Sequence, residues 1–332
     1  MTNYILRRLF WGLLAICIIT CVNFVIIKLV PGDPVRAMLG DYPAPRDYVE
    51  RVTRELGLDQ PLHIQFVRYV TNLAQGDFGF SFSNRRPVLP LILDRAQYTL
   101  LLILPSIVVS VVLGIVLAMV SARRSQGAVD NSISAVVALG YSMPSFWLGQ
   151  ILVLIFAIGL SWLPAAGLRS LRVQPEGLSG ALDVMKHMIL PMICVVSFKL
   201  AIILRVARAS IMGVLQDDFV ITARAKGVPE REIMRRHILP NALIPVIAVT
   251  GYQFGHALTS SILVETVFAW PGLGSLFIDA VTNRDFPVLQ GILVLSTVLV
   301  VAANLIADIV ASYADPRVRR NLGARSGRIL SR

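Results

Sequence analysis

Few side chains in the apolar parts of this 332-residue sequence could carry chemistry. His256 lies in the middle of an uncharged run, and no second histidine or acid stands three or four residues away, so no metal site is predicted. A histidine in that setting is more often a hydrogen-bonded packing residue than a ligand. Glu265 and Asp308 lie within or beside apolar runs, where a charge costs about 2.5–3.5 kcal/mol or more at the centre of a bilayer. For each acid two roles are open. One is structural, as an interface anchor or ion-pair partner, and the other is a role in a solute path.

The sequence contains no motif typical of an enzyme active site. Neither H-E-x-x-H nor G-x-S-x-G occurs, and no Gly-Lys pair exists from which a phosphate-binding P-loop could be built. A membrane hydrolase is therefore disfavoured. The chain is predicted to have no catalytic residue, no metal and no cofactor of its own.

The most informative polar pattern lies in residues 217–232. Asp218 suits the amino-terminal end of a helix, Lys226 suits its carboxyl end, and Gly227 can adopt the left-handed conformation that ends it. Pro229 then suits the first turn of another helix. The pattern predicts two short helices that meet at a glycine and form a compact knob. A pair of amphipathic helices lying on lipid headgroups is the alternative that these residues alone leave open.

The composition indicates which elements position these residues, because 55% of the chain is hydrophobic and only 15% is charged. That ratio is too apolar for an ordinary water-soluble domain and favours a membrane protein. Five uncharged runs are long enough to cross hydrocarbon as helices, and a sixth is interrupted by Lys199, which either snorkels or faces protein. The predicted fold class is an all-α membrane protein with six transmembrane helices. They are Leu9–Ile27, Tyr98–Val120, Ser132–Leu163, His187–Leu204, Asn241–Val264 and Phe286–Ala307.

Small and helix-breaking residues mark two of these spans. The run from Ser132 to Leu163 exceeds one crossing, and Pro144 offers a break within it, so one bent helix is predicted. Gly114 and Ala118 allow a neighbouring helix to approach the second span closely. That neighbour could belong to this chain or to another subunit.

The basic residues indicate the orientation of the spans. Seventeen Lys and Arg residues fall in the segments on one side, which include both termini, whereas the short loops 164–186 and 265–285 on the other side hold four. By the positive-inside rule the first side is cytoplasmic. Its charges account for the whole net charge of +11, so basicity is a topology signal and no nucleic-acid partner is predicted.

The long first external loop is predicted to be folded. Helical spacing extends over Arg46–Leu56, with Gly57 as its stop, and Pro61 opens a second helix, Leu62–Leu73. The predicted domains are a first segment and span (1–30), an external helical lobe (31–96), a five-span core with a cytoplasmic loop at 209–240 (97–312), and a basic cytoplasmic tail (313–332).

The sequence of the predicted knob resembles a motif of a known family. The stretch Ile221–Gly227, followed after nine residues by His237, Leu239 and Pro240, is similar to the E-A-A-x-x-x-G-x9-I-x-L-P loop of ABC-importer permeases. Ile221 stands where the motif has Glu, and His237 where it has Ile, so the contacts of that glutamate are not carried over. The resemblance implies an ATPase-coupling loop in place of the interfacial helices. Its residues would be Asp218, Ala223, Arg224, Lys226, Gly227, His237, Leu239 and Pro240.

Further segments resemble the dipeptide, oligopeptide, nickel and glutathione branch of these permeases, and specifically its subunit with the long first periplasmic loop. They are Tyr4–Leu9, Val30–Pro34, Leu56–Pro61, Gly76–Gly79, Arg86–Val88, Asn241–Pro245, Glu265–Gly274 and Asp315–Arg317. They occur in the order of that branch and cover essentially the whole chain.

The resemblance implies the type I ABC importer permease fold in a bacterial inner membrane. This chain would form half of a path for a small peptide or related solute. Its partners would be membrane lipid, a second homologous permease, two cytoplasmic ATPase subunits that hold ATP and Mg²⁺, and an external solute-binding protein. The alternative class, an ion-coupled secondary transporter, is disfavoured by the scarcity of acids at mid-depth, where such proteins need an ionisable relay.

Overall fold

The computed structural model describes residues 2–29, 45–55, 57, 59–81, 83–170 and 176–314. The segments Val30–Pro34 and Asp315–Arg317, and nearly all of the predicted basic tail, lie outside these residues. Within the described part the chain is almost entirely helical, apart from a short antiparallel pairing of β1 (Phe80–Ser81) with β2 (Arg86–Pro87) that the sequence did not predict.

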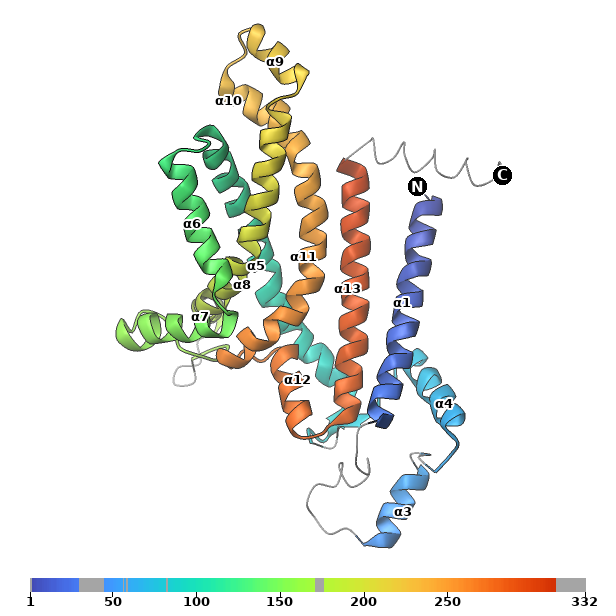
Figure 1. Ribbon diagram of the computed structural model, residues 1–332. Helices are drawn as coiled ribbons and strands as arrows, with labels where there is room; N and C mark the ends of the chain where they lie inside the picture. Colours follow the sequence, from blue (N-terminus) through green and yellow to red (C-terminus); the bar gives the residue numbers. More distant parts are fainter. Residues whose placement is uncertain are drawn as a thin grey trace, which may run out of the picture.

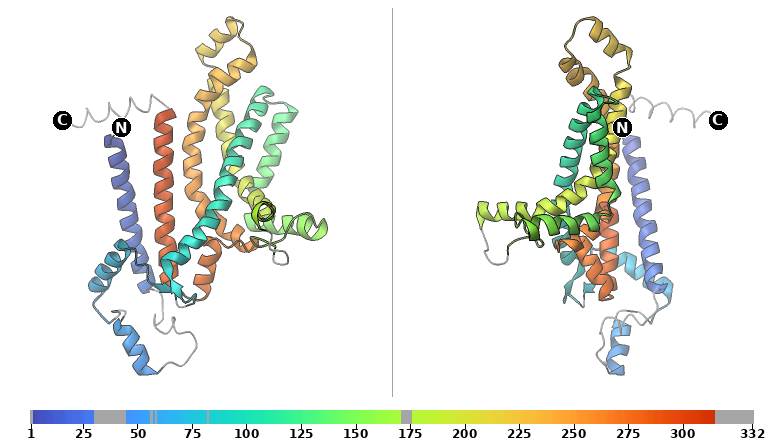
Figure 2. Two further views of the ribbon diagram at one scale, coloured as in Figure 1. Left: turned by 180° about the vertical axis from the view of Figure 1, so that it is seen from behind. Right: turned by 60° about the vertical axis from the view of Figure 1, so that its left-hand side comes forward.

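Five helices in the described residues are long and apolar enough to cross a bilayer, and they confirm the corresponding predicted spans. α5, α8 and α11 pack together at the centre, and α1 lies beside α13 at one edge of the bundle (Figures 1 and 2). The five helices are α1 (Thr2–Leu29), α5 (Val88–Arg123), α8 (Gly177–Val214), α11 (Leu239–Val267) and α13 (Phe286–Ala314).

The remaining predicted span is broken. α6 (Ala128–Ser142) and α7 (Ser145–Leu152), which continues as a π-helix over Val153–Gly159, meet at an angle of 102°. The prediction of one bent helix is therefore wrong, although the break falls where the sequence placed the kink. Met143 is extended because the ring of Pro144 disfavours a helical residue before it, and Pro144 has no N–H with which to continue the helix. Counted as one span, this pair brings the number of spans to six.

The two ends of the bundle carry different structures (Figure 1). At one end, here the α9 end, α9 (Asp218–Ala225), α10 (Glu230–Glu232) and a π-helix over Ile233–Ile238 project beyond the bundle. The start of α1 lies at the same end, as does the end of the described part of α13. At the other end, here the α12 end, lie α12 (Leu273–Thr282), α3 (Arg46–Glu55) and α4 (Leu62–Ala74). The two helices predicted between the first and second spans are thus confirmed.

Close packing joins α5 to α8 within this chain. A Cβ at Gly114 would lie 2.6 Å from Cγ2 of Ile203, so only glycine fits there. Ala118 is fully buried in a cluster that includes Ile203 and Leu204. The small residues of the second span therefore serve packing inside the subunit. Lys199 is 1% exposed and faces protein rather than an interface with water.

Candidate coupling site

The knob at the α9 end is shaped by the residues that the sequence singled out. Asp217 is extended and precedes α9, whose first turn holds Asp218. At the other end Gly227 has φ +73°, and its N–H donates to the carbonyl of Arg224 at 2.9 Å, while Val228 N–H donates to Ala223 at 3.2 Å. These two bonds form a Schellman motif, which needs a left-handed residue at the glycine position. The chain then turns through Pro229 into α10.

The predicted coupling residues divide into an outer set and an inner set. The outer, exposed set comprises Asp218, Arg224, Lys226, Gly227 and Pro240. Ala223 is buried, and His237 and Leu239 are half-buried where the π-helix passes into α11. The structure thus brings most of these residues onto one projecting element, with its charges outward. Ile221, which replaces the motif glutamate, is 55% exposed on the outer side.

An apolar core joins the knob to the spans. Val220 and Ala223 of α9 pack with Ile233 and Ile238, and these residues belong to one buried cluster with residues of α5, α6, α8 and α11. The α11 members are Ala242 and Val246, one and two turns into the span. Because protein interiors are close-packed, α9 is in direct contact with the helices beneath it through this cluster.

The outer surface of the knob is charged, and its acids pair locally. Arg224 Nε lies 2.5 Å from Glu230 Oε1, which links α9 to α10. Arg236 Nη1 lies 2.7 Å from Glu232 Oε1 along the same turn. All four side chains are substantially exposed, so each pair contributes little to stability and can exchange partners.

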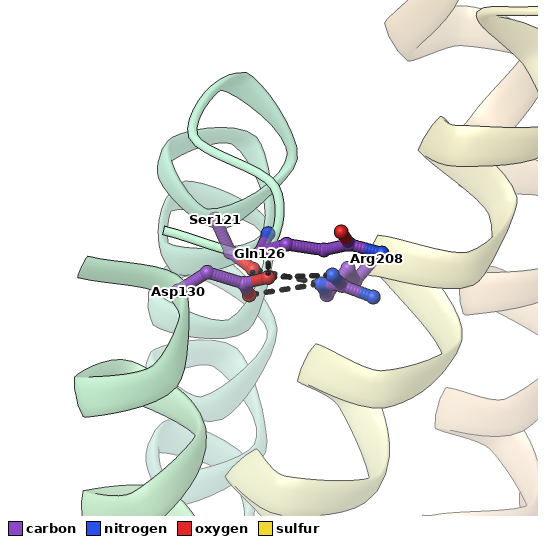
Figure 3. Close-up of polar contacts among 4 residues, drawn as sticks. All are labelled: Ser121, Gln126, Asp130 and Arg208. Atoms are coloured by element: carbon purple, nitrogen blue, oxygen red, sulfur yellow. Dashed lines mark hydrogen bonds and ion pairs between the residues drawn. The ribbon is translucent and has the colours of Figure 1, made fainter. Parts of the chain in front are cut away.

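A polar brace lies at the base of the knob (Figure 3). Arg208 of α8 donates from Nε to Asp130 Oδ1 at 3.0 Å and from Nη2 to Oδ2 at 2.6 Å. Ser121, at the end of α5, also donates to Asp130, and the N–H of Gln126 donates at 3.0 Å. This bidentate arrangement fixes the ends of α5 and α8 and the start of α6 to one another. The sequence did not predict this brace. The only signal in the sequence was one acid, Asp130, close to the basic residues Arg123 and Arg124.

A second network lies at the α12 end around Glu265, which is fully buried. Its carboxylate accepts from Thr99 Oγ1 at 2.8 Å and Ser261 Oγ at 3.2 Å. It also accepts from the N–H groups of Gly274 and Ser275, at 2.6 and 3.3 Å, in the first turn of α12. A carboxylate there satisfies free N–H groups and the positive end of the helix. Glu265 therefore holds α12 against α11 and α5 as a structural anchor, through hydrogen bonds and with no ion pair to any residue that the structure describes.

The other two candidate residues lie far from this network. Asp308 of α13 pairs with Arg8 of α1, with Nε and Oδ2 3.0 Å apart, as expected for a structural ion pair. His256 is exposed on α11, and its ring stacks on Phe198 with centroids 6.1 Å apart. The described residues contain no group of three or more His, Cys, Asp or Glu that could hold a metal ion.

The sequence matches two family descriptions that together cover most of the chain. Residues 110–320 match the binding-protein-dependent transport system inner membrane component, and residues 1–103 match the amino-terminal part of such membrane components. This chain belongs to that family. The permease is therefore an inner-membrane transport subunit of a binding-protein-dependent importer, with the spans and knob described above.

Curated relatives cover almost the whole permease. It is 36% identical over 319 residues to the oligopeptide transport system permease protein AppB of Bacillus subtilis, covering 96% of this chain and 99% of the relative. It is 38% identical over 336 residues to the di/tripeptide transport system permease protein DppB of Pseudomonas aeruginosa, with the same two coverages. The glutathione transport system permease protein GsiC of Escherichia coli K12 is 37% identical, again over 96% and 99%.

Solved structures share the fold at low sequence identity. A chain of the MetNI methionine ABC transporter in an inward-facing conformation matches with a TM-score of 0.55 and 16% identity. The match covers 69% of the permease and 98% of that chain. The spans of the permease thus have the ABC importer fold.

Proposed function

We propose that this permease forms half of the transmembrane path of an ATP-driven importer for a small peptide or related solute. Its relatives are named as permeases of oligopeptide, di/tripeptide and glutathione transport systems, and these names support this solute class. A second homologous permease completes the path, a solute-binding protein delivers the solute on the α12 side, and two ATPase subunits that bind ATP and Mg²⁺ dock at the α9 end. ATP hydrolysis takes place on those subunits.

The observation that carries the proposal is the knob. It presents exposed charges to a partner, and its buried face is continuous with the core of four spans. When the ATPase subunits close, they displace α9, and the packed core passes that displacement to α5, α8 and α11. Transport requires two conformations of the membrane domain that the ATPase contacts in different ways.

Gly227 provides the test, because its φ of +73° strains any β-branched residue. No atom lies within 4 Å of a Cβ built at this position, so the cost of a substitution there is conformational and not steric. We expect Gly227→Val to uncouple ATP hydrolysis from solute uptake in proteoliposomes, with membrane insertion intact. Gly227→Asn is the matched control, since Asn tolerates the left-handed region, and it should retain most uptake.

Normal uptake by Gly227→Val in a fully assembled complex would show that the glycine does not set the coupling geometry. Uptake that needs an ion gradient and no ATP would overturn the proposed function itself and favour a secondary transporter.

A further inference from the structure

Three stacked rings from three helices form a row on the surface of the membrane domain. Tyr141 of α6 stacks on Phe198 of α8 with centroids 4.8 Å apart, and Phe198 stacks on the His256 ring of α11, with planes within 11°. We call these three residues the ring row. Tyr141 is 38% exposed and His256 is exposed, whereas Phe198 is half-buried between them. The row therefore lies on an outer face and not in the core.

The ring row lies far from the α9-side ends of its helices, and Tyr141 is the penultimate residue of α6, at the break before α7. Tyr141, Phe198 and His256 stand 13, 16 and 17 residues from the α9-side ends of their helices. At 1.5 Å per residue these separations place all three at about 20–26 Å along their helices. The hydrocarbon core is about 30 Å thick. An imidazole or a phenol facing lipid at that depth would lose its hydrogen bonds to water, so a polar neighbour is favoured.

Lys199 follows Phe198 of the ring row in α8. Its side chain is 1% exposed, and its Nζ has no hydrogen-bond partner among the described residues. Gln253, one helical turn before His256, is 2% exposed, and its Nε2 also lacks a partner in the described part of the chain.

The two atoms without a partner, Lys199 Nζ and Gln253 Nε2, both belong to hydrogen-bond donor groups. The charge of a buried ammonium is weakly screened, so it acts on the surface above it more strongly than an exposed lysine would. The face that carries the ring row therefore favours an occupant that brings hydrogen-bond acceptors. Lipid tails bring none, whereas a peptide-class solute brings carbonyl oxygens, a carboxylate and planar amide groups that stack on rings.

We propose that the ring row lines the solute path and that Lys199 makes this wall electropositive, so that passing solutes meet it through their carboxylate and carbonyl groups. The inference rests on the proposed importer function and names a wall of its path. In this conformation Lys199 acts through its field, because its Nζ is covered. The other occupants of this face, lipid or the second permease, are outcomes of the test.

Thiol labelling distinguishes these occupants. His256→Cys is assembled with its partner subunits in membrane vesicles, after the exposed cysteines Cys17 and Cys21 are replaced by Ala. We expect the new thiol to react with charged, membrane-impermeant methanethiosulfonates. Val108→Cys on α5, where Val108 is 61% exposed among other exposed apolar residues, is the matched control, and it should react only with a lipophilic maleimide. If His256→Cys reacts only with the maleimide, or with no reagent, the face is covered by lipid or by the second permease and the proposal fails.

The charge of Lys199 is tested with reagents of opposite charge. In His256→Cys the ratio of anionic to cationic labelling rates, each normalised to a free thiol, should exceed one. Lys199→Met should lower this ratio at least threefold, and Lys199→Arg should keep it. Lys199→Gln serves in place of Lys199→Met if the latter does not assemble. An unchanged ratio after loss of the charge would overturn the electropositive wall.

The labelling needs neither ATP nor solute, so its failure is separable from failure of the proposed function. ATP-dependent uptake by the unmodified permease, together with no labelling of the His256→Cys variant by the charged reagents, would overturn this inference alone.

Discussion

The knob and the α12 end of the permease are held together by different kinds of contact. At the α12 end, the buried carboxylate of Glu265 satisfies two hydroxyls and two backbone N–H groups. At the α9 end, charges pair on the exposed surface of the knob, as in Arg224 with Glu230, above an apolar core. A buried polar network fixes one geometry, whereas exposed pairs exchange with water or a partner at small cost. The α12 end is thus built to hold its shape, whereas the knob offers its charges on an exposed surface above an apolar core.

The largest expected effect comes from removing the buried carboxylate. Glu265→Ala leaves the Thr99 hydroxyl and the N–H groups of Gly274 and Ser275 without their acceptor. Because each buried unsatisfied group costs about 1–3 kcal/mol, we expect a loss of about 3 kcal/mol or more in the free energy of unfolding. Thermal unfolding of the purified complex measures it.

Glu265→Gln keeps one acceptor oxygen and should lie between the wild-type permease and Glu265→Ala. The control is Thr266→Ala at the exposed neighbouring position, which should leave the unfolding temperature almost unchanged. A small effect of Glu265→Ala would mean that α12 is held by its apolar contacts alone.

The next effect is at the brace beneath the knob. Asp130→Asn removes the charge that Arg208 binds with two hydrogen bonds. We expect a smaller fall in unfolding temperature than for Glu265→Ala, together with fewer solute molecules moved per ATP hydrolysed. Adding Arg208→Ala to Asp130→Asn should cause little further loss, because residues that share one network are not additive. Fully additive losses would show that the two side chains act independently.

Charge reversal on the knob should affect assembly and not stability. We expect Arg224→Glu or Lys226→Glu to lower recovery of the ATPase subunits with the permease, while the unfolding temperature stays the same, because both side chains are exposed. Combining Arg224→Glu with Glu230→Arg restores the internal pair but not the outward charge, so recovery should stay low. Full recovery in the single reversals would assign these residues to lipid.

The smallest effect is expected between the two edge helices. The pair of Arg8 with Asp308 is 3.0 Å long, and the two side chains are 48% and 25% exposed. Partly exposed pairs are worth at most about 1 kcal/mol, so Asp308→Asn should change the free energy of unfolding by no more than that. A loss as large as that of Glu265→Ala would show that this pair also acts as an anchor.

The sequence predicted what depends on local pattern. Uncharged runs fixed the spans, and the pattern from Asp218 to Gly227 predicted the helix and left-handed stop of the knob, because these features follow from length, capping and glycine. It did not predict contacts between distant residues. Asp130 and Arg208 are 78 positions apart, and Thr99 and Glu265 are 166 apart. The kink at Pro144 was predicted, but the 102° angle was not, because that angle depends on how α7 packs on α8 and α11.

The coupling role of the knob depends most on what α9 contacts. A photo-crosslinking residue at Ile221, which is 55% exposed on the outer side of the knob, reports this contact directly in the assembled importer. We expect adducts with an ATPase subunit, both with and without ATP, and none from the same probe at Leu104, an exposed apolar residue of α5. Adducts of position 221 with phospholipid alone, in every nucleotide state, would contradict the proposal that the knob couples the ATPase to the spans.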